Sequence, residues 1–192
     1  MGAHAYPSGM PRSEYLSLLE REMIPYASKH TRFNDVFCEV GAFTVDESRK
    51  VLEWGLVYGL RPKIHSDEFN ALGGTEMAVS MGAVSCDHLL KVTETGINAL
   101  ASSNTIAVTM PGTAFYLDKP YADARKLIDA GCTVALGSDF NPGSSQIPSM
   151  AFAMGLAVSR MGMTPEEALS AATVNAAAAI NEDVGSLKVG ER

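Results

Sequence analysis

Short runs of β-favouring residues alternate along this chain with longer segments of helical periodicity, and this alternation limits the fold more than any other feature. Successive βαβ units produce such a pattern, and they build a parallel sheet covered by helices. We expect six strands, in the runs MGAHA, DVFCEV, PKIHS, AVSCDH, TIAVTM and TVALGSD, at 1–5, 35–40, 62–66, 83–88, 105–110 and 133–139. The chain is therefore predicted to be an α/β protein.

Helices are expected between these strands and after the last of them. Their predicted ranges are 13–28, 44–59, 73–82, 93–103, 121–131, 147–162 and 164–180. Ser13 and Thr44 are the expected N-caps of the first two helices, and Gly131 ends the fifth. Thr164 with Glu167 three residues later forms a capping box, and Pro165 occupies the first helical position.

The spacing of strands and helices suits either an open doubly wound sheet or part of a (β/α)8 barrel. A complete barrel typically needs ~250 residues, and this chain has 192. The run ALGG lacks the G-x-G-x-x-G spacing, and PGT and NPGS are not phosphate-binding loops, which disfavours a nucleotide site. We therefore expect one domain, 1–192, built as an incomplete barrel with about six of the eight strands.

Composition excludes several functional classes. The formal net charge is −7, the isoelectric point is about 5.1 and there is no Lys/Arg cluster, so nucleic acid is not an expected partner. No apolar run is long enough to span a bilayer, and the first residues do not resemble a secretory signal, so we expect a cytoplasmic protein without a membrane partner. Cys38, Cys86 and Cys132 are widely spaced, which favours reduced, packed thiols.

Four of the predicted strands end in ionisable residues, namely His4, His65, His88 and Asp139. In a parallel barrel all strand carboxyl ends open on one face, so these side chains are expected to converge. Imidazole and carboxylate are suitable ligands for zinc or iron, and a metal with an open position lowers the pKa of bound water. Taken singly, each histidine could be an ordinary hydrogen-bonded residue, and Asp139 before Asn-Pro-Gly could be a turn former. Glu68, close to His65 in sequence, could likewise be a solvated loop acid.

The blocks KIHSDEFNALGGTEMAVSMGAVSCDHL, MPG and GSDFNPGSS, with GAHA and DVFCEVGAFT before them, resemble the imidazolonepropionase family of the metal-dependent amidohydrolase superfamily. The resemblance runs from residue 2 to residue 190. It implies a TIM-like (β/α)8 barrel and a hydrolase for the cyclic amide C–N bond, which converts 4-imidazolone-5-propanoate to N-formimidoyl-L-glutamate in histidine degradation. The implied cofactor is one zinc or iron ion, and the implied partner is a small-molecule substrate.

The resemblance also implies residue roles. His65 and Asp139 would be metal ligands at the ends of the fifth and eighth strands. Glu68 would contact the imidazolone ring and activate the attacking water, His88 would polarise the carbonyl or move a proton, and Asp139 would share in catalysis. The substrate would be bound by His4, Glu68, Asn141, Gly143 and Ser144.

The family's first strand carries a His-x-His pair and a nearby arginine, and this sequence has neither in that pattern. We therefore expect a missing N-terminal segment or a homo-oligomer, and little activity from the chain alone. Two other interpretations stay open: another cyclic amidohydrolase or deaminase, and a non-catalytic partial barrel whose exposed edge binds a partner chain.

Overall fold

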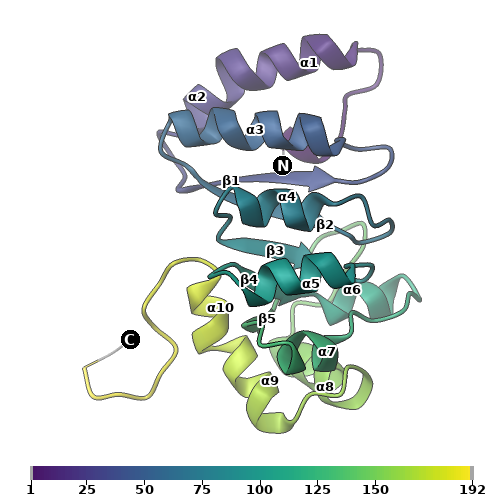
Figure 1. The fold of residues 1–192 in the computed structure, drawn as a ribbon, viewed down its shortest axis with the longest axis vertical. Helices are drawn as coiled ribbons and strands as arrows, with labels where there is room; N and C mark the ends of the chain where they lie inside the picture. The colour runs from purple at the N-terminus through teal and green to yellow at the C-terminus, as the bar shows by residue number, and fades with distance from the viewer. Residues whose placement is uncertain (1, 191–192) are drawn as a thin grey trace.

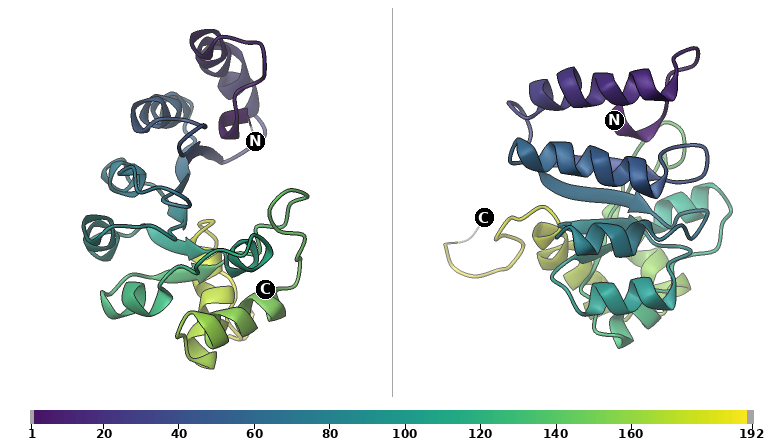
Figure 2. Two further views of the ribbon diagram at one scale, coloured as in Figure 1. Left: turned by 90° about the vertical axis from the view of Figure 1, so that its right-hand side faces the viewer. Right: turned by 45° about the horizontal axis from the view of Figure 1, so that its top comes forward.

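The structure is a computed structural model, and it describes residues 2–190. Its centre is a parallel five-stranded sheet in which each strand pairs with the next along the chain, in the order β1-β2-β3-β4-β5 (Figure 1). Most of the helices between the strands lie along the outer side of this curved row of strands (Figure 2). This sequential order is that of a barrel wall, not of a doubly wound sheet. The strands are β1 (Phe33–Cys38), β2 (Arg61–Ser66), β3 (Ser85–His88), β4 (Ile106–Thr109) and β5 (Val134–Leu136).

The predicted helices are present, and one additional helix follows β4. Between the strands lie α3 (Val45–Val57), α4 (Gly74–Ser80), α5 (Glu94–Ala101), the additional α6 (Pro111–Tyr116) and α7 (Ala124–Asp129). The chain begins with a 3-10 turn, η1 (Gly2–His4), followed by α1 (Arg12–Leu18), the π-helical turn η2 (Leu19–Met23) and α2 (Ile24–Ala27). After β5 come α8 (Met150–Arg160), α9 (Pro165–Ala172) and α10 (Val174–Ala178).

Most of the predicted helix ends are confirmed. Thr44 and Glu47 form a capping box at the start of α3, with Glu47 N donating to Thr44 Oγ1 at 3.2 Å and Thr44 N donating to Glu47 Oε2 at 2.9 Å. Thr164 and Glu167 do the same for α9. Each box satisfies backbone N–H groups that have no partner inside the helix. Glu167 is also held by Arg125 of α7, whose Nη1 donates to both carboxylate oxygens at 2.9 Å.

Three predictions are wrong in detail. The first strand is instead the 3-10 turn η1; small residues such as Gly2 and Ala3 favour a strand weakly, and Pro7 follows at once. Helix α1 begins at Arg12 with Pro11 as its N-cap, so Ser13 lies inside the helix. The helix expected over 164–180 is two helices, because Thr173 leaves the helical conformation at φ −123° and ψ −93°.

The two faces of the sheet differ in chemistry. Strand pairing aligns a row of buried apolar residues across the sheet, Val36, Ile64, Cys86, Ala107 and Val134, and this row belongs to the main core. The residues of the two neighbouring rows point to the inner face instead. One row carries Asp35, Lys63 and Ser85, and the other carries Phe37, His65, Asp87 and Val108. The inner face is thus polar over β1–β3 and apolar over β4 and β5. All three cysteines are buried and free, as predicted.

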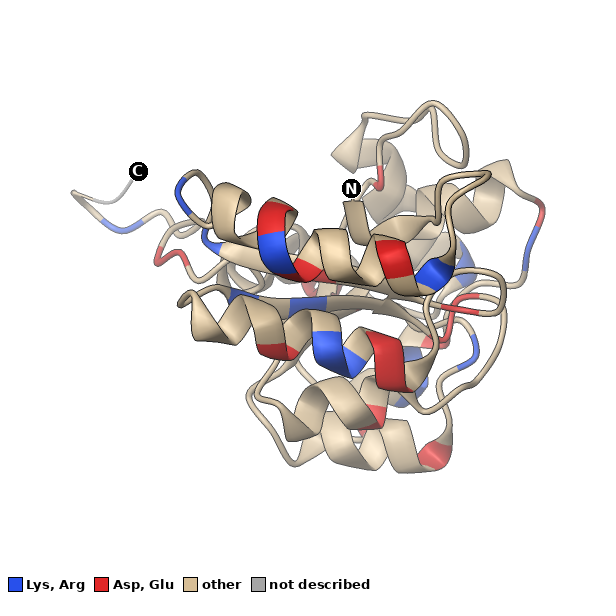
Figure 3. Cartoon of the chain, turned by 90° about the horizontal axis from the view of Figure 1, so that it is seen from above, with Lys and Arg blue, Asp and Glu red and all other residues tan. Residues whose placement is uncertain are grey.

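The outer surface carries charges of both signs. Lys and Arg alternate with Asp and Glu over the outer helices (Figure 3). None of the helices within residues 2–190 is long and apolar enough to cross a membrane.

Candidate active site

The residues predicted at the strand ends lie together. His65 is the fifth residue of β2, His88 is the last residue of β3, and Asp139 follows β5 by three residues. They surround a cavity of about 310 Å³ at the carboxyl ends of the strands, lined by His4, Phe37, His65, Glu68, His88, Asp139, Asn141, Pro142 and Ser144. Parallel strands bring these side chains to one edge of the sheet although they are far apart in sequence.

Three of these residues form a donor set that fits a metal ion. His65, His88 and Asp139 each offer one ligand atom, and the three atoms lie within 4.8 Å of one another. Two imidazole nitrogens and one carboxylate oxygen are ligands that zinc and iron accept. His88 Nδ1 is buried without a hydrogen-bond partner, which a structural histidine normally avoids. His88 is therefore a candidate ligand beside His65 and Asp139, the two expected from the sequence.

The backbone is held in an uncommon conformation at this edge. Asp67, His88 and Asp139 have positive φ values of 52°, 83° and 49°. Residues other than glycine adopt this left-handed region rarely and at a cost, and such residues concentrate at functional sites. Two of the three are proposed site residues, and Asp67 directly precedes Glu68.

Glu68 and His88 face each other inside the site. His88 Nε2 lies 3.7 Å from Glu68 Oε2, and both side chains are almost completely buried. Burial, reinforced by the charge of Asp139, raises the pKa of Glu68 to about 7. Burial and the nearby positive charge of His65 lower the pKa of His88 to about 3. Near neutral pH, Glu68 is therefore poised to gain or lose a proton beside an uncharged imidazole.

Asp35, which sequence reasoning did not select, contacts two of the site's histidines. Its carboxylate lies 3.0 and 3.1 Å from His65 Nδ1 and 3.2 Å from His4 Nε2. Burial alone would lower the pKa of His65, but the charge and hydrogen bond of Asp35 raise it to about 9. Burial likewise works against ionised Asp35, yet the charge of His65 and hydrogen bonds from both rings hold the pKa of Asp35 well below its usual range.

A second polar group lies deeper on the inner face and was also missed. Ser85 Oγ donates to Asp87 Oδ1 at 2.6 Å, and Lys63 Nζ lies 3.8 Å from Asp87 Oδ2 and contacts Ser85 Oγ. A strand that is buried on both faces is normally apolar throughout. The charged residues inside runs such as NDVFC and KIHS were therefore the signal in the sequence that could have indicated a polar inner face.

Glu39 holds the loop that carries Glu68. Its carboxylate, 4% exposed, accepts hydrogen bonds from Phe69 N at 2.9 Å, Asn70 N at 3.1 Å and Asn70 Nδ2 at 2.8 Å. On the other side of Glu68, Asp67 accepts from Thr75 Oγ1 at 2.6 Å. The two carboxylates therefore fix the backbone immediately before and after Glu68.

The loop after β5 is stabilised by its own polar groups. Asn141 Oδ1 accepts hydrogen bonds from Gly143 N at 2.9 Å and Ser144 N at 2.8 Å. Asp139 Oδ2 accepts from Thr113 Oγ1 at 2.6 Å. Asn141 and Ser144 border the cavity, whereas Gly143 is exposed and does not line it. In this structure the amides of Gly143 and Ser144 are occupied within the loop.

The sheet order and the strand-end cluster define the class: an incomplete α/β barrel with its site at the carboxyl ends of the strands. The chain belongs to the amidohydrolase family, whose sequence model matches residues 63–192.

Curated relatives indicate which kind of amidohydrolase the chain is similar to. The chain is 50% identical to the imidazolonepropionase of Geobacillus sp. (strain WCH70) and 44% identical to that of Bacteroides fragilis (strain YCH46), each over 198 aligned residues that include the whole chain. These matches span 47% and 48% of the two relatives. The chain thus covers about half the length of the curated relatives it matches.

Solved structures agree on the fold. An adenosine deaminase from Xanthomonas campestris with bound zinc superposes with a TM-score of 0.72 at 17% identity, over 98% of this chain and 49% of that one. A guanine deaminase from C. acetobutylicum superposes with a TM-score of 0.69, also at 17% identity, over 98% of this chain and 53% of the deaminase. The predicted incomplete barrel is confirmed: five strands of this chain correspond to about half of such proteins.

Proposed function

We propose that this chain supplies about half of a hydrolase that opens a cyclic amide, with 4-imidazolone-5-propanoate as substrate and N-formimidoyl-L-glutamate as product. The observation that carries the proposal is the group of His65, Glu68, His88 and Asp139 around one cavity. Identity of 50% to an imidazolonepropionase across the whole chain supports this choice of substrate.

His65, His88 and Asp139 would hold one zinc or iron ion. Bound there, the ion would supply a Lewis acid that polarises the amide carbonyl and makes water a stronger nucleophile. Asp139 is kept in place by Thr113 and by the loop after β5, so its carboxylate is oriented before any ligand arrives.

Glu68 would act as the general base and then as the general acid. With a pKa of about 7, its carboxylate takes a proton from the attacking water and returns it to the ring nitrogen when the C–N bond breaks. With Nδ1 given to the ion, His88 would keep Nε2, 3.7 Å from Glu68, to assist this transfer or to polarise the carbonyl. His4, Asn141 and Ser144 border the cavity and would contact the substrate, while Gly143 could contribute only through its backbone.

A chimera tests the proposal. This chain replaces the aligned 47% of the Geobacillus imidazolonepropionase, and consumption of imidazolone propanoate is followed by its absorbance. We expect turnover within an order of magnitude of the parent enzyme and its loss in Glu68→Gln. The chimera must also fold and bind zinc. A folded, zinc-loaded chimera that leaves imidazolone propanoate intact but deaminates guanine or adenine would refute the substrate and favour a deaminase.

A further inference from the structure

Asp35 is the only acidic residue of the described chain within hydrogen-bond distance of two histidines of the site. Its two oxygens lie 3.1 and 3.0 Å from His65 Nδ1, and Oδ2 lies 3.2 Å from His4 Nε2. His65 comes from β2 and His4 from η1, so one carboxylate on β1 joins three segments. The rings of His4 and His65 meet edge to face, with centroids 4.8 Å apart.

These contacts determine where the ring protons lie. An ionised carboxylate can only accept hydrogen bonds, so the facing nitrogens, His65 Nδ1 and His4 Nε2, must each carry a hydrogen. When the rings are neutral, the opposite nitrogens, His65 Nε2 and His4 Nδ1, are the ones that can act as lone-pair donors. Asp87 cannot replace Asp35 in this role, because its Oδ2 is 3.9 Å from His65 Nδ1, beyond hydrogen-bond distance, and its other oxygen accepts from Ser85.

We propose that Asp35 is a positioning residue that holds His65 with hydrogen on Nδ1, so that Nε2 is presented to His88 and Asp139 as a metal ligand, and that it fixes His4 in the complementary tautomer. The role of Nε2 as a metal ligand rests on the proposed function, whereas the hydrogen bond from His65 Nδ1 to Asp35 does not. Carboxylates that hold a ligating histidine in this way are worth about 10–100-fold in metal affinity.

The competing arrangement is a metal ion bound by His4, Asp35 and His65 themselves, whose ligand atoms also lie within 4.8 Å of one another. That arrangement would use Nδ1 of His65 instead of Nε2. The two arrangements therefore differ in which nitrogen of one ring keeps its hydrogen.

Long-range ¹H–¹⁵N spectra of the ¹⁵N-histidine-labelled chain separate them. In the zinc-loaded chain we expect a hydrogen on His65 Nδ1 and a zinc-shifted Nε2 signal. Zinc on Nδ1, or a ring without hydrogen there, overturns the proposal. If the chain binds no zinc but shows a hydrogen-bonded His65 Nδ1–H that Asp35→Asn abolishes, the positioning role stands and the proposed metal site fails.

Variants add a quantitative measure. Zinc affinity is determined by competition with a chromophoric chelator for the wild type, Asp35→Asn and the control Asp87→Asn, which also removes a negative charge near His65 but no hydrogen bond to it. We expect Asp35→Asn to weaken binding about 10–100-fold and Asp87→Asn to leave it close to wild type. Equal weakening in both would mean that only the net charge matters. If Asp35→Asn does not fold, the spectra of the wild type still decide.

Discussion

Replacing Glu68 by glutamine should make this chain more stable in alkaline solution. Glu68 is 6% exposed, and its carboxylate accepts no hydrogen bond from any residue between 2 and 190. The nearest basic group is His88, which is uncharged above pH 3 or so because its own pKa is lowered to about 3. The charge of His65 favours the ionised form of Glu68, but burial and the charge of Asp139 outweigh it, so the chain carries an ionised Glu68 at a cost.

The size and sign of this cost follow from the pKa. Folding raises the pKa of Glu68 from 4.5 to about 7, so the native state binds the proton more tightly than the unfolded state. The resulting stability is complete below about pH 4.5 and is lost as the pH rises through about 7. At 1.36 kcal/mol per pKa unit, the loss is on the order of 3 kcal/mol. Glutamine has no charge to bury and should not show this loss.

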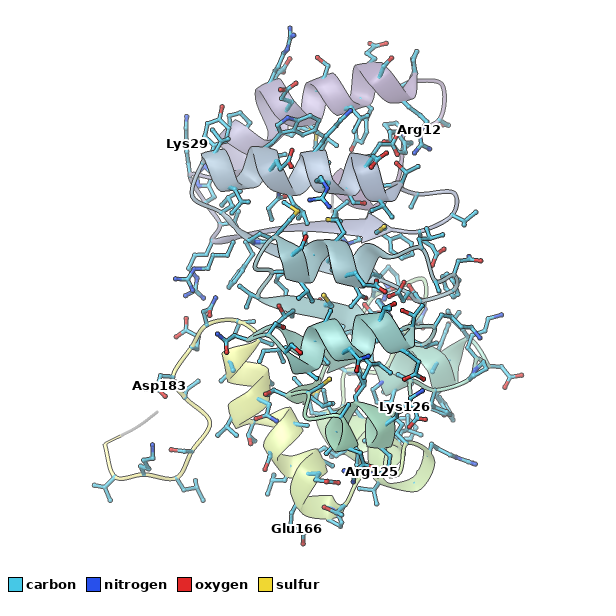
Figure 4. All side chains as sticks on the ribbon, in the orientation of Figure 1. Arg12, Lys29, Arg125, Lys126, Glu166 and Asp183 are labelled. Carbon is cyan, nitrogen blue, oxygen red and sulfur yellow. The ribbon has the colours of Figure 1, made fainter. Side chains whose placement is uncertain are left out.

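Urea unfolding of the metal-free chain at pH 5 and pH 9 measures the effect. We expect Glu68→Gln to differ little from the wild type at pH 5 and to be about 3 kcal/mol more stable than the wild type at pH 9. Glu166→Gln, on the exposed face of α9 (Figure 4), is the matched control and should give the same difference at both pH values. If Glu68→Gln also gives the same difference at both pH values, the burial argument is wrong.

Three further changes test other parts of the structure. In the chimera, Glu39→Gln should lower kcat more than it raises KM, because it loosens the backbone beside Glu68 without touching the cavity; an unchanged kcat would contradict this. Thr164→Ala should cost about 1 kcal/mol of unfolding free energy by removing the N-cap of α9, measured by urea unfolding, and no loss would mean that the capping box contributes nothing. Zinc affinity should rise about tenfold per pH unit up to about pH 9, because the ion must displace the proton of His65; competition titrations between pH 6.5 and 8 would show a flat profile if His65 is not a ligand.

The sequence predicted the fold well where local signals act. Thr44 and Thr164 mark helix starts through chemistry confined to four residues, and the β-favouring runs identified all five strands. The strand predicted at 1–5 was wrong: Gly2–His4 form a 3-10 turn that packs on β1, and no strand among the described residues pairs with them. Strand formation depends on a neighbour that no local pattern can supply.

The site was predictable only in part for a related reason. His65, His88 and Asp139 lie at strand ends, and the topology of parallel strands is enough to bring them together. Asp35, Lys63 and Asp87 lie within strands, and their partners depend on the register: strand pairing sets Asp35 against Lys63 and His65 against Asp87. A register is fixed by the packing of whole strands, so the contact of Asp35 with His65 could not be predicted from either segment alone.

The charges of the site explain how metal binding and Glu68 should influence each other. In the metal-free chain, protonated His65 balances Asp35. A divalent ion that replaces the proton of His65 adds one positive charge beside Asp139 and Glu68, which favours the ionised form of Glu68 and lowers its pKa. The alkaline loss of stability caused by Glu68 should then shrink when zinc is bound. Urea unfolding at pH 9, with and without saturating zinc, measures this. The unfolding free energy gained by Glu68→Gln should be smaller in the zinc-loaded chain. An equal gain in both would place the ion too far from Glu68 to serve the proposed reaction.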